Sequence, residues 1–169
     1  MAKSNIVLIG MPGAGKSTLG VVLAKNTGRD FMDCDLLIQH ETGAMLADLI
    51  EERGPEGFIQ LENDILCTVD VQNTVIATGG SACYSDEAMR HLRSIGTVVY
   101  LKVSYDELVN RLGDLEERGV VMRHGIGMGL RGLLEERAPL YEQYADITVE
   151  PESTSIIDSA KIVASQLPD

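Results

Sequence analysis

The chain has 169 residues, of which 44% are hydrophobic and 24% charged, as is typical of one globular domain. Acidic residues outnumber basic ones 26 to 14, and the formal net charge of −12 excludes a general nucleic-acid or anionic-membrane surface. One local basic pocket remains compatible with this charge. No apolar run has the length of a membrane span, and the three cysteines lack metal-ligand spacing. We therefore expect a cytoplasmic monomer with free thiols, in which residues 1–169 form a single domain.

Short apolar runs alternate along the chain with stretches of helical periodicity. Strands are predicted over residues 5–9, 30–33, 74–78, 97–103 and 147–149. Helices are predicted over residues 16–26, 46–71 with a break at Gly54-Pro55, 105–112 and 153–167. Such alternation predicts an α/β fold, with a parallel sheet covered by helices on both faces.

The stretch from Gly119 to Gly132 departs from this alternation. It contains five glycines and three basic or histidine side chains, Arg123, His124 and Arg131. We predict a mobile segment here rather than an element of the core.

Residues 10–17 read GMPGAGKS and match the phosphate-loop pattern GxxxxGK[ST] at every fixed position. The motif follows a buried strand and opens a helix, so its backbone N–H groups would face an anion. Lys16 would reach the β- and γ-phosphates, and the Ser17 hydroxyl would ligate Mg²⁺. The alternative is a glycine-rich turn with an incidental lysine. The predicted nucleotide contacts are Gly13, Ala14, Gly15, Lys16, Ser17 and Thr18.

Two aspartates, Asp33 and Asp35, flank Cys34 directly after the second predicted strand. In an extended chain their side chains point to the same side. Ligands of open α/β sheets lie beyond the carboxyl ends of the strands, so both carboxylates are expected near the phosphate loop. One would hold Mg²⁺ through water, and the other would orient or deprotonate an acceptor hydroxyl. The alternative is that Asp35 caps a helix that starts at Leu36.

Four blocks in this order resemble the shikimate kinase family over nearly the whole chain. They are residues 10–18, Asp33-Cys34-Asp35, Gly79-Gly80 and residues 136–142. The resemblance implies a P-loop, nucleoside-monophosphate-kinase-like fold of three α/β/α layers, with a five-stranded parallel sheet of order 2-3-1-4-5 and a mobile lid at about 113–130. It also implies ATP and Mg²⁺ as cofactors, and transfer of the γ-phosphoryl group to a hydroxyl of a small metabolite, by default shikimate.

The resemblance further implies roles for single residues of the loop and the aspartate pair. Lys16 would act in catalysis at the phosphates, and Ser17 and Asp33 would support Mg²⁺. Asp35 would hold the acceptor hydroxyl and act in catalysis with a lid arginine, Arg118.

Arginines in the second half of the chain also match the family by position. Arg118 would close with the lid on the transferring phosphoryl group, and Arg111 would stack on adenine. Arg137 would grip the substrate carboxylate next to Gly79 and Gly80. For Arg111 and Arg118 the alternative is a solvated charge on a helix face.

The chain departs from the family pattern mostly on the acceptor side. Ile59 stands where the pattern Phe-Arg-x-x-Glu places a carboxylate-binding arginine, and Ser81 stands where the pattern has a third glycine. Gly119 follows Arg118 where the pattern has proline. Because the ATP-facing positions are intact, we expect kinase chemistry to be retained and the shikimate acceptor to be weakened.

Glu62 loses its family partner through the change at residue 59. A carboxylate without a partner in a pocket is costly unless a cation arrives. A hydroxylated amino acid is therefore an alternative acceptor, with its ammonium at Glu62, its carboxylate at Arg137 and its hydroxyl at Asp35. A plainer alternative is that Glu62 pairs with Arg53 or faces water. A nucleotide-binding regulatory module without transfer activity is the alternative from another functional class.

Overall fold

The computed structural model describes residues 3–112, 129–151 and 155–169, so Arg118 and most of the predicted lid lie outside the described residues. The described chain contains one parallel sheet with the strand order β2-β3-β1-β4-β5. Its strands are β1 (Asn5–Ile9), β2 (Asp30–Asp33), β3 (Thr74–Ala77), β4 (Gly96–Leu101) and β5 (Ile147–Val149). The predicted sheet and its order 2-3-1-4-5 are confirmed.

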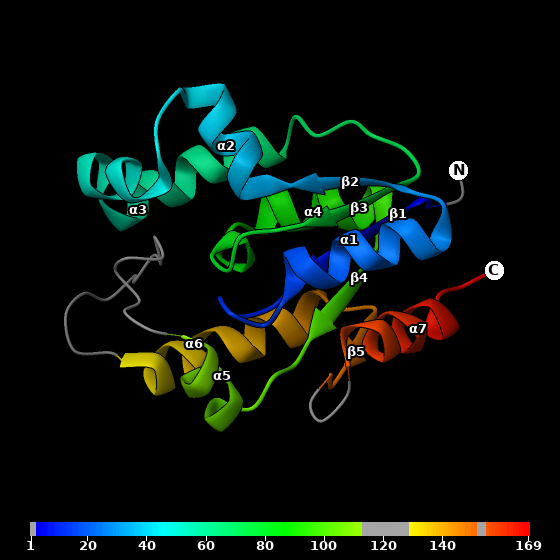
Figure 1. The fold of residues 1–169 in the computed structure, drawn as a ribbon. Helices are drawn as coiled ribbons and strands as arrows, with labels where there is room; N and C mark the ends of the chain where they lie inside the picture. The colour runs from blue at the N-terminus through cyan, green and yellow to red at the C-terminus, as the bar shows by residue number, and fades with distance from the viewer. Residues whose placement is uncertain (1–2, 113–128, 152–154) are drawn as a thin grey trace.

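Helices cover both faces of the sheet (Figure 1). They are α1 (Lys16–Thr27), α2 (Cys34–Thr42), α3 (Leu46–Leu66), α4 (Asp86–Ile95), α5 (Tyr105–Arg111), α6 (Gly129–Tyr144) and α7 (Ile156–Gln166), with a short 3₁₀ turn at Ala82–Tyr84. Helices α1 and α7 pack together on one face, and α4 and α6 contact β4 on the other. The predicted three-layer α/β/α fold is confirmed. Among the described helices, none is long and apolar enough to cross a membrane.

The three central strands β1, β3 and β4 are buried along their whole length. Strands covered on both faces read as continuous apolar runs, which is why the sequence showed them clearly. Asn5 is a polar exception at 2% exposure. Its side chain donates to the carbonyl oxygens of Val71 and Ile95 and accepts from the N–H of Thr74. Asn5 lies at the start of β1. Its side chain therefore connects β1 to the start of β3 and to the segments that precede β3 and β4.

Three of the described helices, α2, α4 and α6, are not among the helices that the sequence predicts. Helix α2 corresponds only to the alternative in which a helix starts at Leu36, and α4 has no counterpart in the prediction. Residues 129–132, expected in the mobile segment, instead begin α6. Leu133 is fully buried, and Leu130 and Leu134 pack against the core, so the apolar spacing outweighs the glycine count. The predicted break in the second helix is present, because Gly54 has a left-handed φ of 72° inside α3.

Candidate active site

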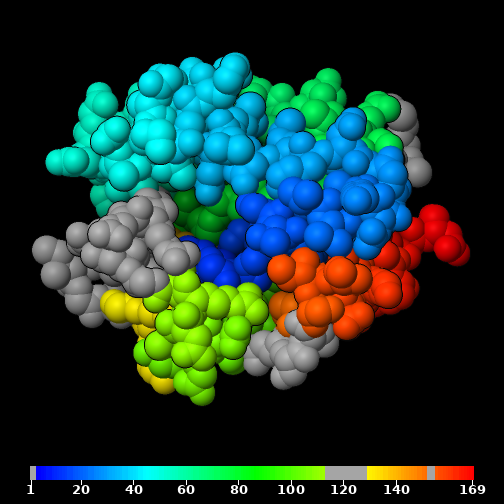
Figure 2. All heavy atoms as spheres, in the orientation of Figure 1, coloured from blue at the N-terminus to red at the C-terminus, as the bar shows by residue number. Residues whose placement is uncertain are grey.

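A cavity of about 360 Å³ opens at the carboxyl ends of the strands. Figure 2 shows the surface hollowed between the α2–α3 region and α5. Segments distant in the sequence meet here, namely the phosphate loop, the starts of α1, α2 and α3, the chain after β3, and α6. The lining residues are Pro12, Gly13, Gly15, Lys16, Ser17, Thr18, Asp35, Leu46, Phe58, Thr78, Gly79, Gly80, Ser81 and Arg137.

The phosphate loop has the backbone shape that its glycines predict. Gly13 and Gly15 have φ values of 80° and 90°, which L side chains rarely adopt. Gly15 is the N-cap of α1, and no side chain caps the helix. The first N–H groups of an uncapped helix lack partners, so they suit a bound anion such as phosphate.

Lys16 lies within this loop and is 8% exposed. Its Nζ donates to the carbonyl oxygens of Gly10 at 2.7 Å and Met11 at 2.8 Å. Burial lowers the pKa of Lys16 to about 8, and the charge of Asp35 opposes this shift. A bound phosphate would favour the protonated ammonium, because an opposite charge raises the pKa of a lysine.

Asp33 connects the phosphate loop to α2. Its Oδ1 accepts from the N–H groups of Asp35 and Leu36, so Asp33 is the N-cap of α2. Its Oδ2 accepts from Ser17 Oγ at 2.6 Å. This carboxylate and hydroxyl fit Mg²⁺, which binds oxygen atoms and is commonly held by one or two protein ligands besides phosphates and water. The described residues contain no group of three or more His, Cys, Asp or Glu that could hold a metal.

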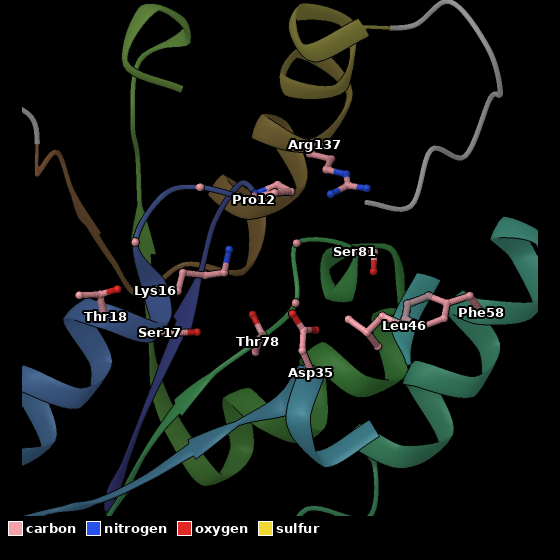
Figure 3. Close-up of a pocket in the computed structure, with 14 residues that line it drawn as sticks. Pro12, Lys16, Ser17, Thr18, Asp35, Leu46, Phe58, Thr78, Ser81 and Arg137 are labelled. Carbon is pink, nitrogen blue, oxygen red and sulfur yellow. The ribbon is translucent and has the colours of Figure 1, made fainter. Parts of the chain in front are cut away.

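The chain does not continue as an extended strand through the aspartate pair. Helix α2 begins at Cys34 and is capped by Asp33, so the alternative in which Asp35 caps a helix from Leu36 is wrong. Asp35 lies in the first turn of α2, and its carboxylate faces the cavity (Figure 3). Burial and then the charge of Asp33 raise its pKa, against the effect of Lys16. A raised pKa suits a carboxylate that accepts a proton from a substrate hydroxyl.

Two glycines after β3 allow polar side chains to approach the backbone closely. A Cβ at Gly79 would lie 2.7 Å from Asp35 Oδ1 and 2.9 Å from Glu62 Oε2. A Cβ at Gly80 would lie 2.8 Å from Pro12 Cδ and 2.9 Å from Arg137 Nη1. The close approach, rather than a positive φ, therefore explains both glycines.

Arg137 projects from α6 into the opposite side of the same hollow (Figure 3). It is fully buried, its Nε donates to Tyr84 Oη at 3.1 Å, and its guanidinium lies 5.1 Å from the Tyr84 ring. The Tyr84 hydroxyl also bonds to Glu136, and Tyr141 Oη donates to the Gly80 carbonyl at 2.6 Å. These contacts fix the guanidinium where it can meet an anionic group in the cavity.

Arg111 is a half-buried residue of α5 that contacts the phosphate loop. It pairs with Glu107 at 2.8 Å, and its Nη1 lies 3.3 Å from the carbonyl oxygens of both Gly13 and Ala14. The alternative of a solvated charge on a helix face is therefore wrong for Arg111.

Comparison with known proteins decides the family. A model of the shikimate kinase family matches residues 12–167. The chain belongs to the shikimate kinase family. Curated shikimate kinases from Vibrio cholerae and Shewanella baltica are 37% and 38% identical over 166 residues, which are 98% of this chain and 93% and 95% of theirs. The solved shikimate kinase from Acinetobacter baumannii, in complex with shikimate, is 32% identical, with a TM-score of 0.85 over 99% of this chain and 97% of that one. Membership makes the chain an ATP-dependent phosphotransferase that acts on a hydroxyl group.

The departures from the shikimate kinase pattern meet at Glu62. This residue is fully buried, and its Oε1 accepts from Ser81 Oγ at 2.7 Å. Its Oε2 has no hydrogen-bond partner, and burial raises its pKa to about 7. The alternatives in which Glu62 pairs with Arg53 or faces water are therefore wrong. Ser81 has an ordinary φ of −88°, so replacing the family glycine here introduces no backbone strain.

Some residues of the site were not anticipated. Leu46, Phe58 and Thr78 line the cavity, and Tyr84 supports Arg137. Tyr141 carried a usable signal, since it follows Arg137 by four residues and therefore lies on the same helix face.

Proposed function

We propose that this shikimate kinase family member transfers the γ-phosphoryl group of Mg²⁺-bound ATP to a hydroxyl of a small metabolite that carries a carboxylate. Shikimate, the ligand in the Acinetobacter baumannii structure, is the first candidate acceptor. One observation carries the proposal. The same cavity is lined by Lys16 of the phosphate loop, by Asp35, a carboxylate with a raised pKa, and by the buried Arg137.

The nucleotide end of the cavity is formed by the loop and the start of α1. Lys16 and the free N–H groups at the helix start would bind the phosphates, and Ser17 with Asp33 would hold Mg²⁺. When bound, Mg²⁺ neutralises phosphate charge and orients the transferring group. Arg111 would lie near the nucleotide, since it contacts the loop backbone. By family position, Arg118 would bind the transferring phosphoryl group.

The acceptor end is formed by α2, the chain after β3, and α6. Asp35 would hold the acceptor hydroxyl and take its proton, and Arg137 would bind the carboxylate. Phosphoryl transfer depends chiefly on positioning and charge stabilisation, so holding the acceptor at two points is a direct contribution to rate.

Two other functions fit the cavity less well. A nucleoside monophosphate acceptor would place a phosphate beside the Asp35 carboxylate, where like charges repel. A regulatory module without transfer activity would have no need for Asp35 at a point where it faces the phosphate loop. An acceptor hydroxyl explains this placement directly.

Acceptor-dependent formation of ADP tests the proposed function. We expect Asp35→Asn to lower kcat by about 10²- to 10⁴-fold, the usual contribution of a general base, with MgATP binding retained. Asp70→Asn, the same change at an exposed position, should leave kcat unchanged. Full activity of Asp35→Asn would contradict the proposal. A rate of ADP formation that does not increase with any added alcohol would contradict it as well.

A further inference from the structure

Glu62 is a buried carboxylate whose hydrogen bonding is incomplete. Its side chain is fully buried on α3, and Ser81 satisfies Oε1. Oε2 has no partner. An unsatisfied buried carboxylate is costly, so a charged group retained here needs an explanation such as a ligand.

The unsatisfied oxygen is buried directly behind residues that line the acceptor end. A Cβ at Gly79 would touch both Glu62 Oε2 and Asp35 Oδ1, so the two oxygens flank the same Cα position. Gly79, Asp35 and Ser81 all line the cavity. Glu62 Oε2 is therefore beside the place where the acceptor hydroxyl would bind.

The charges around the acceptor end are unbalanced. Lys16 and Arg137 both line the cavity, but Lys16 Nζ is bonded to the phosphate-loop carbonyls of Gly10 and Met11. At the acceptor end, Asp35 and Glu62 contribute two carboxylates and Arg137 one cation. The side chain one helical turn before Glu62 is the aliphatic Ile59, and no lysine or arginine among the described residues forms an ion pair with Glu62. A purely anionic acceptor would occupy Arg137 and leave Glu62 without a cation.

We propose, on the basis of the proposed function, that the acceptor is a hydroxylated α-amino acid of the size of homoserine, threonine or serine. Its ammonium binds Glu62 Oε2, its carboxylate binds Arg137, and its hydroxyl binds Asp35. A zwitterion satisfies both ends of the site, because it brings one charge of each sign. Burial raises the pKa of Glu62 to about 7. A cation bound beside the carboxylate would favour its ionised form, because an opposite charge lowers the pKa of an acid.

The transfer itself is that of the family. The acceptor oxygen forms a bond to the γ-phosphorus, and the bond from that phosphorus to the β,γ-bridging oxygen breaks. ADP leaves with the bonding electron pair, and the hydroxyl proton passes to Asp35. The products are ADP and an O-phosphoamino acid.

A panel of matched acceptors tests the ammonium site. L-Homoserine, L-threonine, L-serine and shikimate are each assayed with MgATP for ADP, with the phosphorylated product detected by ³¹P NMR. 4-Hydroxybutyrate serves as homoserine without its ammonium, and 3-amino-1-propanol as homoserine without its carboxylate. The ammonium of the amino acid would form a charge-assisted contact with Glu62 that the analogue cannot form. We therefore expect the kcat/KM of the best amino acid to be about 10- to 100-fold above that of its analogue lacking the ammonium.

Two substitutions on α3 test the assignment to Glu62. Glu62→Gln keeps the shape and the Ser81 bond, so it should erase most of the preference for homoserine over 4-hydroxybutyrate, mainly through KM. Ile59→Arg places a cation one turn from Glu62 and should lower amino-acid turnover relative to shikimate turnover. Glu52→Gln, the same chemical change at an exposed position of α3, should preserve the preference.

The outcomes separate the two proposals. Efficient shikimate turnover without amino-acid turnover overturns the amino-acid acceptor and leaves the proposed function standing. Equal turnover of homoserine and 4-hydroxybutyrate also overturns the ammonium site. If MgATP binds but no alcohol in the panel yields ADP, the proposed function fails and the acceptor assignment fails with it.

Discussion

Glu62 illustrates how one side chain can make stability depend on pH. Its pKa rises from 4.5 to about 7 on folding, with burial as the largest cause and the Ser81 hydrogen bond opposing it. The folded state therefore holds the proton more tightly than the unfolded state. The resulting stability is fully present below pH 4.5 and is lost as the pH rises through about 7.

We expect Glu62→Gln to remove this dependence. The amide cannot ionise, so the variant and the parent should have similar Tm values near pH 4.5. Above pH 7 the variant should be more stable by a few degrees, because it carries no buried charge. Thermal unfolding followed by circular dichroism from pH 4.5 to 8.5 measures the difference. A variant that is less stable at pH 8 would show that the ionised carboxylate has a favourable partner in the free protein.

At the scale of elements, Asn5 connects the start of the sheet to its surroundings. Its amide serves three backbone groups, the carbonyls of Val71 and Ile95 and the N–H of Thr74. All three belong to other segments that lie at the amino ends of the central strands. A buried polar residue inside an apolar strand therefore has a structural explanation, distant from the cavity.

Removing this amide should destabilise the fold without changing the chemistry. Asn5→Ala leaves the buried N–H of Thr74 and the part-buried carbonyls of Val71 and Ile95 without their side-chain partner, and we expect a loss of about 2–4 kcal/mol in the free energy of unfolding. Urea denaturation at unchanged m-value measures it, while kcat of the folded variant should equal that of the parent. Gln72→Ala, at an exposed neighbouring position, should change stability by less than about 0.5 kcal/mol. A comparably small loss for Asn5→Ala would show that water replaces its amide.

At the scale of the whole molecule, a net charge of −12 coexists with a site suited to anions. Lys16 and Arg137 line one cavity, at 8% and 0% exposure, while the excess acidic residues lie elsewhere on the chain. Total charge thus describes the surface, whereas nucleotide binding depends on a few buried cations and backbone N–H groups.

The three thiols report on opening of the whole molecule. Cys34 and Cys83 are buried and Cys67 is half-buried, and burial raises the pKa of each. We expect a thiol reagent at pH 8 to modify one cysteine readily, and the other two only as fast as the fold opens. Cys67→Ser should remove the fast phase, and urea should release the remaining thiols. Rapid modification of two or more thiols in the native protein would contradict this packing.

The sequence by itself determined the features that depend on local order. The phosphate loop could be read from residue types and spacing, and the central strands from continuous apolar runs. The order of the four motif blocks indicated the shikimate kinase family, and with it the strand order that the structure confirms. The sequence also showed that Ile59 leaves Glu62 without its usual partner.

Only the tertiary structure decided what surrounds that carboxylate. The spacing of residues in the sequence left open whether the Glu62 carboxylate contacts water, Arg53 or a ligand. It also left open whether Asp33 or Asp35 caps α2. The bond from Ser81 to Glu62 joins α3 to the chain after β3, and the carboxylate of Asp35 comes to the same Gly79 from α2. Burial, partners and pKa depend on distances between segments far apart in the chain, and those distances exist only once the helices have packed on the sheet.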